Sequence, residues 1–408
     1  MSAADSAAAR TQAATTRAAR FMAFVRDRET EQTLRNFIFN EALPHTHIGL
    51  GGVNEAIAHI TKVGRSPRLL LIDLQGSSMP LSDLARLADV CEPSVQVVAL
   101  GDKNDVALYR GLLGIGVRDY LVKPLTEELL KRTLDLNDGT VRAVPQTRRG
   151  KAISFVGARG GVGTTTVAVN LARHLADSTH RRIAYVDLNV QGGAATSMLG
   201  VRSNNGLSEV LQSIERIDSA FVERTMIPIG SRLFLLSCEL PYGAAWPFKE
   251  GGIERLIDLL TDGFHYVIID TGSGVGRLTT EAFDNSARVY MVSDRSVHGA
   301  HETVRLAQYV EKRENAPVIS FVLNNTIPRT QGNVDKDDFV GAVGRSVLLE
   351  IGYESKVLAI AENVGEPPAG RAANGFTQSI TQIGNDLVGL KATNEARGGS
   401  RGFKWWKR

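Results

Sequence analysis

The sequence predicts two doubly wound α/β domains with mainly parallel sheets, the second larger than the first. Short apolar runs typical of buried strands recur along the 408 residues, and segments with helical periodicity lie between most of them. A stretch of linker composition divides this series in two. With 43% hydrophobic residues, the chain has ample material for packed cores.

The first domain is expected over residues 21–136. Leu34, Phe37 and Ile38 give one face of an amphipathic helix. Residues 1–20, rich in Ala, Thr and Arg and without apolar periodicity, are predicted to be a disordered tail. The strand-like runs of this domain are FMAFV (21–25), RLLLID (68–73), VQVVAL (95–100) and VRDYLV (117–122).

The second domain is expected over residues 151–392. Residues 137–150 before it contain Gly, Pro and polar side chains and are predicted to be a linker, and residues 393–408 form a basic, aromatic tail. The last helix is expected near 377–390. The strand candidates are AISFVG (152–157), RIAYVD (182–187), RLFLLS (232–237), YVIID (266–270), RVYMVS (288–293), VISFVLN (318–324) and VLLEI (347–351).

Charge and composition exclude several classes of protein. The net charge is +3, but residues 1–20 carry +2 and residues 396–408 carry +5, which leaves −4 for residues 21–395. A mildly acidic body argues against a protein that coats nucleic acid. The only cysteines, Cys91 and Cys238, cannot form a disulfide framework, and no apolar run approaches the roughly 18 residues of a spanning helix. We expect a soluble, cytoplasmic protein.

A glycine-rich loop, GARGGVGTTT (157–166), follows one predicted strand and opens a helix whose apolar face is Val167, Leu171 and Leu175. Glycines let successive backbone N–H groups turn inward, and together with the positive helix end they form an anion-binding nest. Compared with G-x-x-x-x-G-K-[ST], Ala158 replaces the first glycine and Thr164 replaces the lysine. The alternative is a glycine-rich turn that binds nothing.

RGGVGTTT followed by YVDLNVQGG resembles the ParA/MinD deviant Walker ATPases, whose motifs read KGGVGKTT and D-x-D-x-Q-G. The stretches GLSEVLQSIERIDSAFVER and ESKVLAIAENVGEPP, with the unit in front, narrow the resemblance to the CpaE/TadZ-type proteins of Flp (Tad) pilus assembly. It covers roughly residues 21–390. It implies a receiver-like, flavodoxin-like domain followed by a ParA/MinD-like P-loop NTPase domain.

The resemblance implies a site for ATP or ADP with Mg²⁺. Arg159 stands at the family's signature lysine, which reaches the phosphates of the partner subunit, and Asn324 matches its adenine-contacting asparagine. Thr165, Asp187 and Asp270 would support Mg²⁺, and Thr166 would touch the α-phosphate. The implied nucleotide-binding set is Arg159, Gly160, Gly161, Val162, Gly163, Thr164, Thr165, Thr166 and Asn324.

Two departures from the family pattern affect catalysis. Thr164 cannot replace the charge of the Walker lysine, and losing one charge-assisted contact costs roughly 1.5–3 kcal/mol. Asn189 occupies the position of the acid that activates water, and an amide is no base. The usual proline after Asp270-Thr271 is Gly272. No residue is assigned as catalytic, and efficient hydrolysis is not expected.

The first domain carries a second motif. GVRDYLVKP (116–124) resembles the last strand of response-regulator receivers, with Lys123 as their phosphate-facing lysine and Asp73 at the phosphoacceptor position. The acid pair that would hold Mg²⁺ reads Arg26-Asp27, and Gly101 replaces an expected hydroxyl. We therefore favour a buried Asp73–Lys123 ion pair in a docking module over control by phosphate.

The tail residues Phe403, Lys404, Trp405 and Trp406 combine aromatic rings with bases, as membrane-interface segments do. Packing on the protein or binding of a partner is the alternative.

The resemblance implies a homodimeric scaffold that takes a polar position at the inner membrane and works with Tad proteins such as the secretion ATPase. A degenerate nucleotide site would act as a structural or slow switch. The rival hypotheses are an active ATPase that cycles between monomer and dimer and a DNA-partitioning ParA protein.

Overall fold

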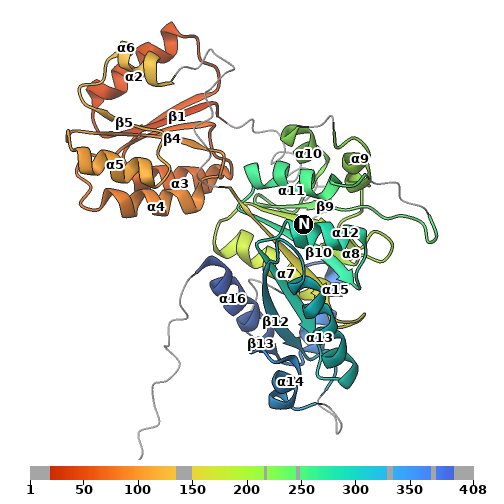
Figure 1. Ribbon diagram of the computed structural model, residues 1–408. Helices are drawn as coiled ribbons and strands as arrows, with labels where there is room; N and C mark the ends of the chain where they lie inside the picture. The colour runs from red at the N-terminus through yellow and green to blue at the C-terminus, as the bar shows by residue number, and fades with distance from the viewer. Residues whose placement is uncertain are drawn as a thin grey trace, which may run out of the picture.

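Two separate sheets organise the part of the chain that the structure describes. The computed structural model describes residues 19–134, 149–215, 218–244, 249–328, 334–368 and 374–389. The two sheets lie in separate parts of the molecule (Figure 1). The five-stranded sheet has the order β2-β1-β3-β4-β5, and the eight-stranded sheet has the order β13-β12-β11-β6-β10-β7-β9-β8. The C-terminal tail and most of the N-terminal tail and linker lie outside the described residues.

The first unit is a parallel sheet between two helical layers. Its strand order, 2-1-3-4-5, is that of flavodoxin-like doubly wound sheets. Helices α2 and α6 cover one face, and α3, α4 and α5 cover the other (Figure 1). The strands are β1 (Phe21–Val25), β2 (Thr46–Leu50), β3 (Leu69–Asp73), β4 (Gln96–Gly101) and β5 (Asp119–Val122). The helices are α2 (Arg28–Asn40), α3 (Val53–Val63), α4 (Pro80–Val90), α5 (Val106–Gly114) and α6 (Glu127–Leu134).

The four strands predicted in this unit are present, but the sequence reading omitted β2. Its sequence, THIGL, contains no run of apolar residues, and its side chains are only half-buried or exposed. An edge strand of this kind lacks the periodic signal of a buried one. Parallel pairing with β1 defines it, from Phe21 opposite Thr46 to Val25 opposite Leu50.

The second unit is larger and its sheet is parallel except for β8, which pairs antiparallel with β9. All seven predicted strands are present, and β8 was not predicted because it has only two residues. The strands are β6 (Lys151–Gly157), β7 (Ile183–Asp187), β8 (Ile227–Pro228), β9 (Leu233–Leu236), β10 (Tyr266–Ser273), β11 (Arg288–Ser293), β12 (Val318–Asn324) and β13 (Val347–Ile351).

Helices cover this sheet on both faces, and two of them form the core beside the glycine-rich loop. Val167, Leu171 and Leu175 of α7 are fully buried as predicted and share a core with Phe376 and Ile380 of α16. The helices are α7 (Thr164–Ser178), α8 (Ala195–Met198), α9 (Gly206–Gln212), α10 (Ser219–Thr225), α11 (Gly252–Gly263), α12 (Arg277–Asp284), α13 (Val297–Glu311), α14 (Lys336–Val343), α15 (Ser355–Val364) and α16 (Gly375–Val388).

A buried arginine connects the two units. The Arg182 side chain, 3% exposed, ion-pairs with Glu223 of its own unit and lies 3.5 Å from Glu92 of the first unit. Its guanidinium carbon is 4.8 Å and 4.4 Å from the ring centroids of Phe234 and Phe264. Cation–π contact and paired carboxylates together compensate for the burial of this charge.

Among the residues that the structure describes, no helix is both long enough and apolar enough to cross a membrane.

Candidate functional site

The carboxyl ends of parallel strands gather the polar residues of the second unit at one edge of the sheet. The glycine-rich loop leaves β6, which lies between β10 and β11. Asp270 lies within β10, and Asp187 ends the next strand, β7. Because all four strands run in the same direction, segments far apart in the sequence meet at this edge.

The loop itself has the backbone of an anion-binding nest. Gly161 and Gly163 have φ angles of +80° and +83°, which residues with a Cβ rarely adopt. Gly163 is also the N-cap of α7, so the first free N–H groups of that helix point toward the loop. No atom lies within 4 Å of where a Cβ on Gly161 would be, which leaves the loop open on that side.

Two buried carboxylates lie side by side next to this loop. Asp187 and Asp270 are direct partners in the parallel register of β7 and β10, and they are 4% and 0% exposed. The Tyr185 hydroxyl donates to Asp270 Oδ2 at 2.9 Å, and interaction with the Thr165 hydroxyl favours the ionised form of Asp270. The N–H groups of Gly272 and Asn189 donate to Asp270 and Asp187, each at 3.0 Å.

Burial makes the negative charge of this pair costly. Loss of solvation, followed by the neighbouring charge of Asp270, raises the pKa of Asp187. Loss of solvation also raises the pKa of Asp270. A divalent cation would remove this repulsion, and two carboxylates with a hydroxyl are the hard oxygen ligands that Mg²⁺ prefers. The donor set therefore fits Mg²⁺ shared with a bound phosphate.

Comparison with known proteins agrees with this geometry. A family model described as an AAA domain matches residues 150–319. The chromosome-partitioning ATPase Soj of Thermus thermophilus is 33% identical over 134 residues, which are 32% of this chain and 50% of that protein. This chain thus spans about half the length of that relative. The septum site-determining protein MinD of Pyrococcus horikoshii, solved in complex with Mg-ADP, matches 60% of this chain and 98% of its own, with 18% identity and a TM-score of 0.52.

The second unit is similar in sequence to the ParA-type ATPase Soj and shares the fold of MinD. A third similarity is to the structure of a CpaE2 pilus-assembly candidate from Sinorhizobium meliloti, which covers 28% of this chain and 96% of that chain at 29% identity. Its TM-score of 0.26 supports no conclusion about this chain.

Thr164 gives the second unit no charge at the position where the resembling P-loop proteins have the Walker lysine. The Thr164 side chain is buried, and a Cβ on Gly157 would lie 2.5 Å from its hydroxyl oxygen. The side chain thus lies against the strand end. Its hydroxyl can donate one neutral hydrogen bond, but it cannot compensate phosphate charge.

The Asn189 side chain lies against Gly272. A Cβ on residue 272 would come within 3.2 Å of the side-chain amide carbon of Asn189. Gly272 has a φ of +69°, an angle that the family's proline cannot adopt at this position. The two departures from the family pattern therefore form one local structure. An amide occupies the place predicted for the acid, and the turn beneath it is adapted to glycine.

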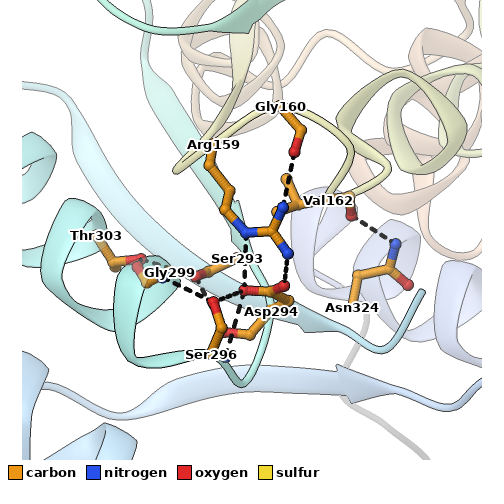
Figure 2. A network of polar contacts seen from close by, with 9 residues as sticks. All are labelled: Arg159, Gly160, Val162, Ser293, Asp294, Ser296, Gly299, Thr303 and Asn324. Atoms are coloured by element: carbon orange, nitrogen blue, oxygen red, sulfur yellow. Dashed lines mark hydrogen bonds and ion pairs between the residues drawn. The ribbon is translucent and has the colours of Figure 1, made fainter. Parts of the chain in front are cut away.

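Arg159 does not point away from its own subunit. It forms an ion pair with Asp294, the residue after β11, through Nη2 and through Nε at 3.4 Å from Oδ1 (Figure 2). Its Nη1 donates to the carbonyl of Gly160 at 3.0 Å. Burial alone would raise the pKa of Asp294, but hydrogen bonds from Ser296 and Arg159 hold it below its usual value.

Asn324 lies at the loop, on the side opposite β10. Its Nδ2 donates to the carbonyl of Val162 at 2.8 Å, and the side chain is buried (Figure 2). Its proximity explains why residue 163 must be glycine, since a Cβ there would collide with the Asn324 amide. The structure thus gives Asn324 a role in holding the loop, while adenine contact stays a prediction.

A second polar cluster lies at the carboxyl edge of the first sheet. The Lys123 Nζ donates to Asp73 Oδ2 at 2.6 Å, to Gln75 Oε1 at 2.7 Å, and to Asp27. Asp73 is fully buried and also accepts from the N–H groups of Arg26 and Gln75. The structure contains the Asp73–Lys123 ion pair that we favoured, with every ammonium hydrogen paired.

The two acids fix the charge of Lys123. Burial alone would lower its pKa, but the hydrogen bonds of Asp27 and Asp73 raise it. For Asp27, burial opposes ionisation, yet Lys123 and Thr30 lower the pKa to about 2. The ammonium thus compensates the carboxylates that a receiver would use for Mg²⁺.

Sequence reasoning missed two residues of these sites. Asp294 stands after the strand RVYMVS, and its only signal was an acid at the carboxyl end of a strand beside the loop-bearing strand. Gln75 follows Asp73 by two residues and carried no signal. The remaining predicted site residues, Phe403, Lys404, Trp405 and Trp406, lie outside the described residues.

Removing the ammonium should destabilise the first unit. Lys123→Met leaves the fully buried Asp73 without a cation, which is expected to lower the free energy of unfolding by about 3–5 kcal/mol. Urea unfolding followed by circular dichroism measures this. Lys131→Met, which removes a 57% exposed lysine paired with Glu41, is the control and should shift the midpoint little. Equal midpoints for the two variants would contradict a structural role for Lys123.

The raised pKa of Asp187 predicts a pH-dependent stability without Mg²⁺. Because burial raises the pKa of both carboxyls, the pair keeps a proton in the native chain at pH values where the unfolded chain is ionised, so stability should fall as pH rises above about 4, by at most about 1.4 kcal/mol per pH unit for each proton. Asp187→Asn should flatten this profile, whereas Asp177→Asn, at an exposed position, should not. Urea unfolding at pH 5, 6, 7 and 8 tests it. Parallel profiles for wild type and Asp187→Asn would show that the pair does not titrate this way.

Proposed function

We propose that this chain is a nucleotide-binding scaffold whose ParA/MinD-like site binds ATP or ADP with Mg²⁺ but hydrolyses ATP poorly. The proposal rests on a difference within the site between the residues that could bind a cation and those expected to support hydrolysis. Asp187 and Asp270 are register partners beside the loop, and together with Thr165 they offer the oxygen ligands that we propose for Mg²⁺. The two positions that support phosphoryl transfer hold the uncharged Thr164 and Asn189.

Nucleotide binding would stabilise a homodimer and so act as a structural or slow switch. The dimer follows from family resemblance, with Arg159 at the position of the residue that crosses to the partner. In the first unit, the Asp27–Lys123–Asp73 cluster favours a docking role over phosphoryl uptake, because the ammonium occupies the space between the carboxylates. We propose a receiver-like docking module joined to the scaffold.

The pathway we propose is Flp (Tad) pilus assembly, with the Tad secretion ATPase as a partner and a polar position at the inner membrane. Its support is the sequence resemblance of the loop, of residues 206–224 and of residues 354–368 to CpaE/TadZ-type proteins. Peripheral membrane contact would come from the tail at 402–408, whose bases and aromatic rings suit an anionic interface.

Calorimetry and phosphate release test the site. The wild-type chain should bind Mg-ATP with phosphate release at the buffer background, and Asp270→Ala should weaken binding at least tenfold. The exposed Asp258→Ala is the matched control and should bind as wild type. Thr164→Lys combined with Asn189→Asp should restore measurable turnover. Rapid phosphate release by the wild type, lost in Asp270→Ala, would favour an active ATPase. Retention of duplex DNA that weakens with added salt would favour a DNA-partitioning protein.

Isolation of the chain from its own host tests the pathway. The Tad secretion ATPase should co-purify with the wild-type chain and be lost, or strongly reduced, with Asp270→Ala if nucleotide controls the scaffold. Retention with Asp258→Ala excludes a general effect of the substitution. Failure to recover any Tad protein with the wild-type chain would contradict the pilus role but leave the nucleotide site unaffected.

A further inference from the structure

We propose that Asp294 is the positioning residue of Arg159. It holds the guanidinium within its own subunit and must release it before Arg159 can meet a nucleotide phosphate. The inference rests on the nucleotide site proposed above. We call the Arg159–Asp294 ion pair the latch. The sequence alone did not indicate that these two residues are partners.

The acceptor half of this latch is rigid. The Asp294 side chain is only 9% exposed, and its Oδ1 accepts from the hydroxyl of Ser296 at 2.7 Å and from its N–H at 3.4 Å. Gly299 in the first turn of α13 comes so close that a Cβ there would collide with Oδ1. The carboxylate is therefore held by the start of α13, as Figure 2 shows.

The turn behind the carboxylate is fixed as well. The Thr303 hydroxyl donates to Ser293 Oγ at 2.9 Å and lies 2.6 Å from the Gly299 carbonyl, which joins the end of β11 to α13 (Figure 2). Ser293 and Thr303 are both buried. An acid held in this way is a preorganised partner and differs from a flexible surface carboxylate.

The donor half is matched in shape. Arg159 approaches Asp294 with Nε and Nη2, one toward each carboxylate oxygen, and keeps Nη1 for the Gly160 carbonyl. A lysine could not make this planar, two-point contact. The Arg159 side chain remains 34% exposed, so a ligand at the loop can reach it.

Release requires only rotation of the Arg159 side chain. The Ala158 N–H donates to the Val292 carbonyl at 2.8 Å, so the backbones of the loop and of the β11 end are tied together. The two states of the latch are thus two side-chain arrangements on a fixed sheet. Arg159 is either paired with Asp294 or turned toward a phosphate.

The competing ligand must carry more negative charge than one carboxylate. A nucleoside triphosphate with Mg²⁺ meets this requirement better than a diphosphate, because it brings a further phosphate group to the loop. As long as the latch is mostly closed, the apparent affinity is reduced by the fraction of open molecules. The latch should therefore weaken binding and sharpen the preference for triphosphate.

Calorimetric titration of the full chain with Mg-ATP and Mg-ADP tests the latch. Asp294→Asn should bind Mg-ATP about tenfold more tightly than wild type, as loss of one charge-assisted pair predicts. Arg159→Gln should bind more weakly than wild type, and adding Asp294→Asn to it should change nothing further. Asp294→Ser repeats the test should the asparagine variant fold poorly.

Asp284→Asn is the matched control. Asp284 makes a two-point ion pair with Arg313, and Arg313 lies just after the C-terminal end of α13, away from the loop. The variant therefore loses a similar pair at a distance from the site. It should leave both affinities unchanged.

Three outcomes are decisive. The latch is supported if Asp294→Asn binds ATP more tightly than wild type and the double variant with Arg159→Gln loses this gain. This holds even where wild type binds too weakly to measure. Equal binding by wild type and Asp294→Asn overturns the latch and leaves the proposed function standing. No binding by any variant overturns the proposed nucleotide site and the latch with it.

A second readout does not depend on nucleotide. The Arg159 Nε–H of the ligand-free chain should exchange slowly with solvent in the wild type and fast in Asp294→Asn, as measured by ¹⁵N-resolved NMR. Fast exchange in the wild type would overturn the closed state directly.

Discussion

The parallel pairing of β6 between β10 and β11 is the constraint on which the candidate site depends. Main-chain hydrogen bonds fix these three strands in register, so their carboxyl ends lie at one edge. The loop leaves β6, Asp270 lies near the end of β10, and Asp294 follows β11. The next strand, β7, adds Asp187 opposite Asp270. The polar groups of the site are held in place by backbone geometry before any side-chain contact is counted.

Buried carboxylates at these edges are compensated in different ways. In the first unit, the ammonium of Lys123 lies between Asp27 and Asp73. At the loop, Asp294 has the guanidinium of Arg159. The Asp187–Asp270 pair has no lysine or arginine within ion-pair distance in the described part of the chain, and hydroxyl and N–H donors surround it instead. A pair with raised pKa values and no base of its own is suited to a divalent cation.

The two units meet at the opposite edge of the second sheet. Arg182 immediately precedes β7, whereas Asp187 ends it, so one short strand joins the arginine at the junction with the first unit to the candidate cation site. The polar cluster of the first unit lies at the carboxyl ends of its own strands. The junction and the two polar clusters therefore occupy different surfaces. This separation suits a scaffold with several contact regions.

Local patterns in the sequence suffice to predict most strands and the glycine-rich loop. Apolar runs and helical periodicity located eleven of the thirteen strands, because a strand buried on both faces must be apolar along its length. The sequence patterns did not predict β2 and β8. These two strands are defined by their pairing at a sheet edge, and their own sequences show little apolar pattern. The resemblance of the chain's motifs to the ParA/MinD and receiver families pointed to the loop, to Asp187 and Asp270, and to the Asp73–Lys123 pair.

The contacts that these residues make depend on how the strands pack together in three dimensions. Arg159 and Asp294 are 135 positions apart, and Asn324 and Val162 are 162 apart. Such contacts depend on strand order and on side-chain rotation, neither of which is encoded in local periodicity. The family resemblance implies that Arg159 meets a phosphate of a partner subunit, and the structure shows it paired with Asp294 of its own chain. The charge was predictable from the sequence, but its partner was decided by which strands lie next to one another.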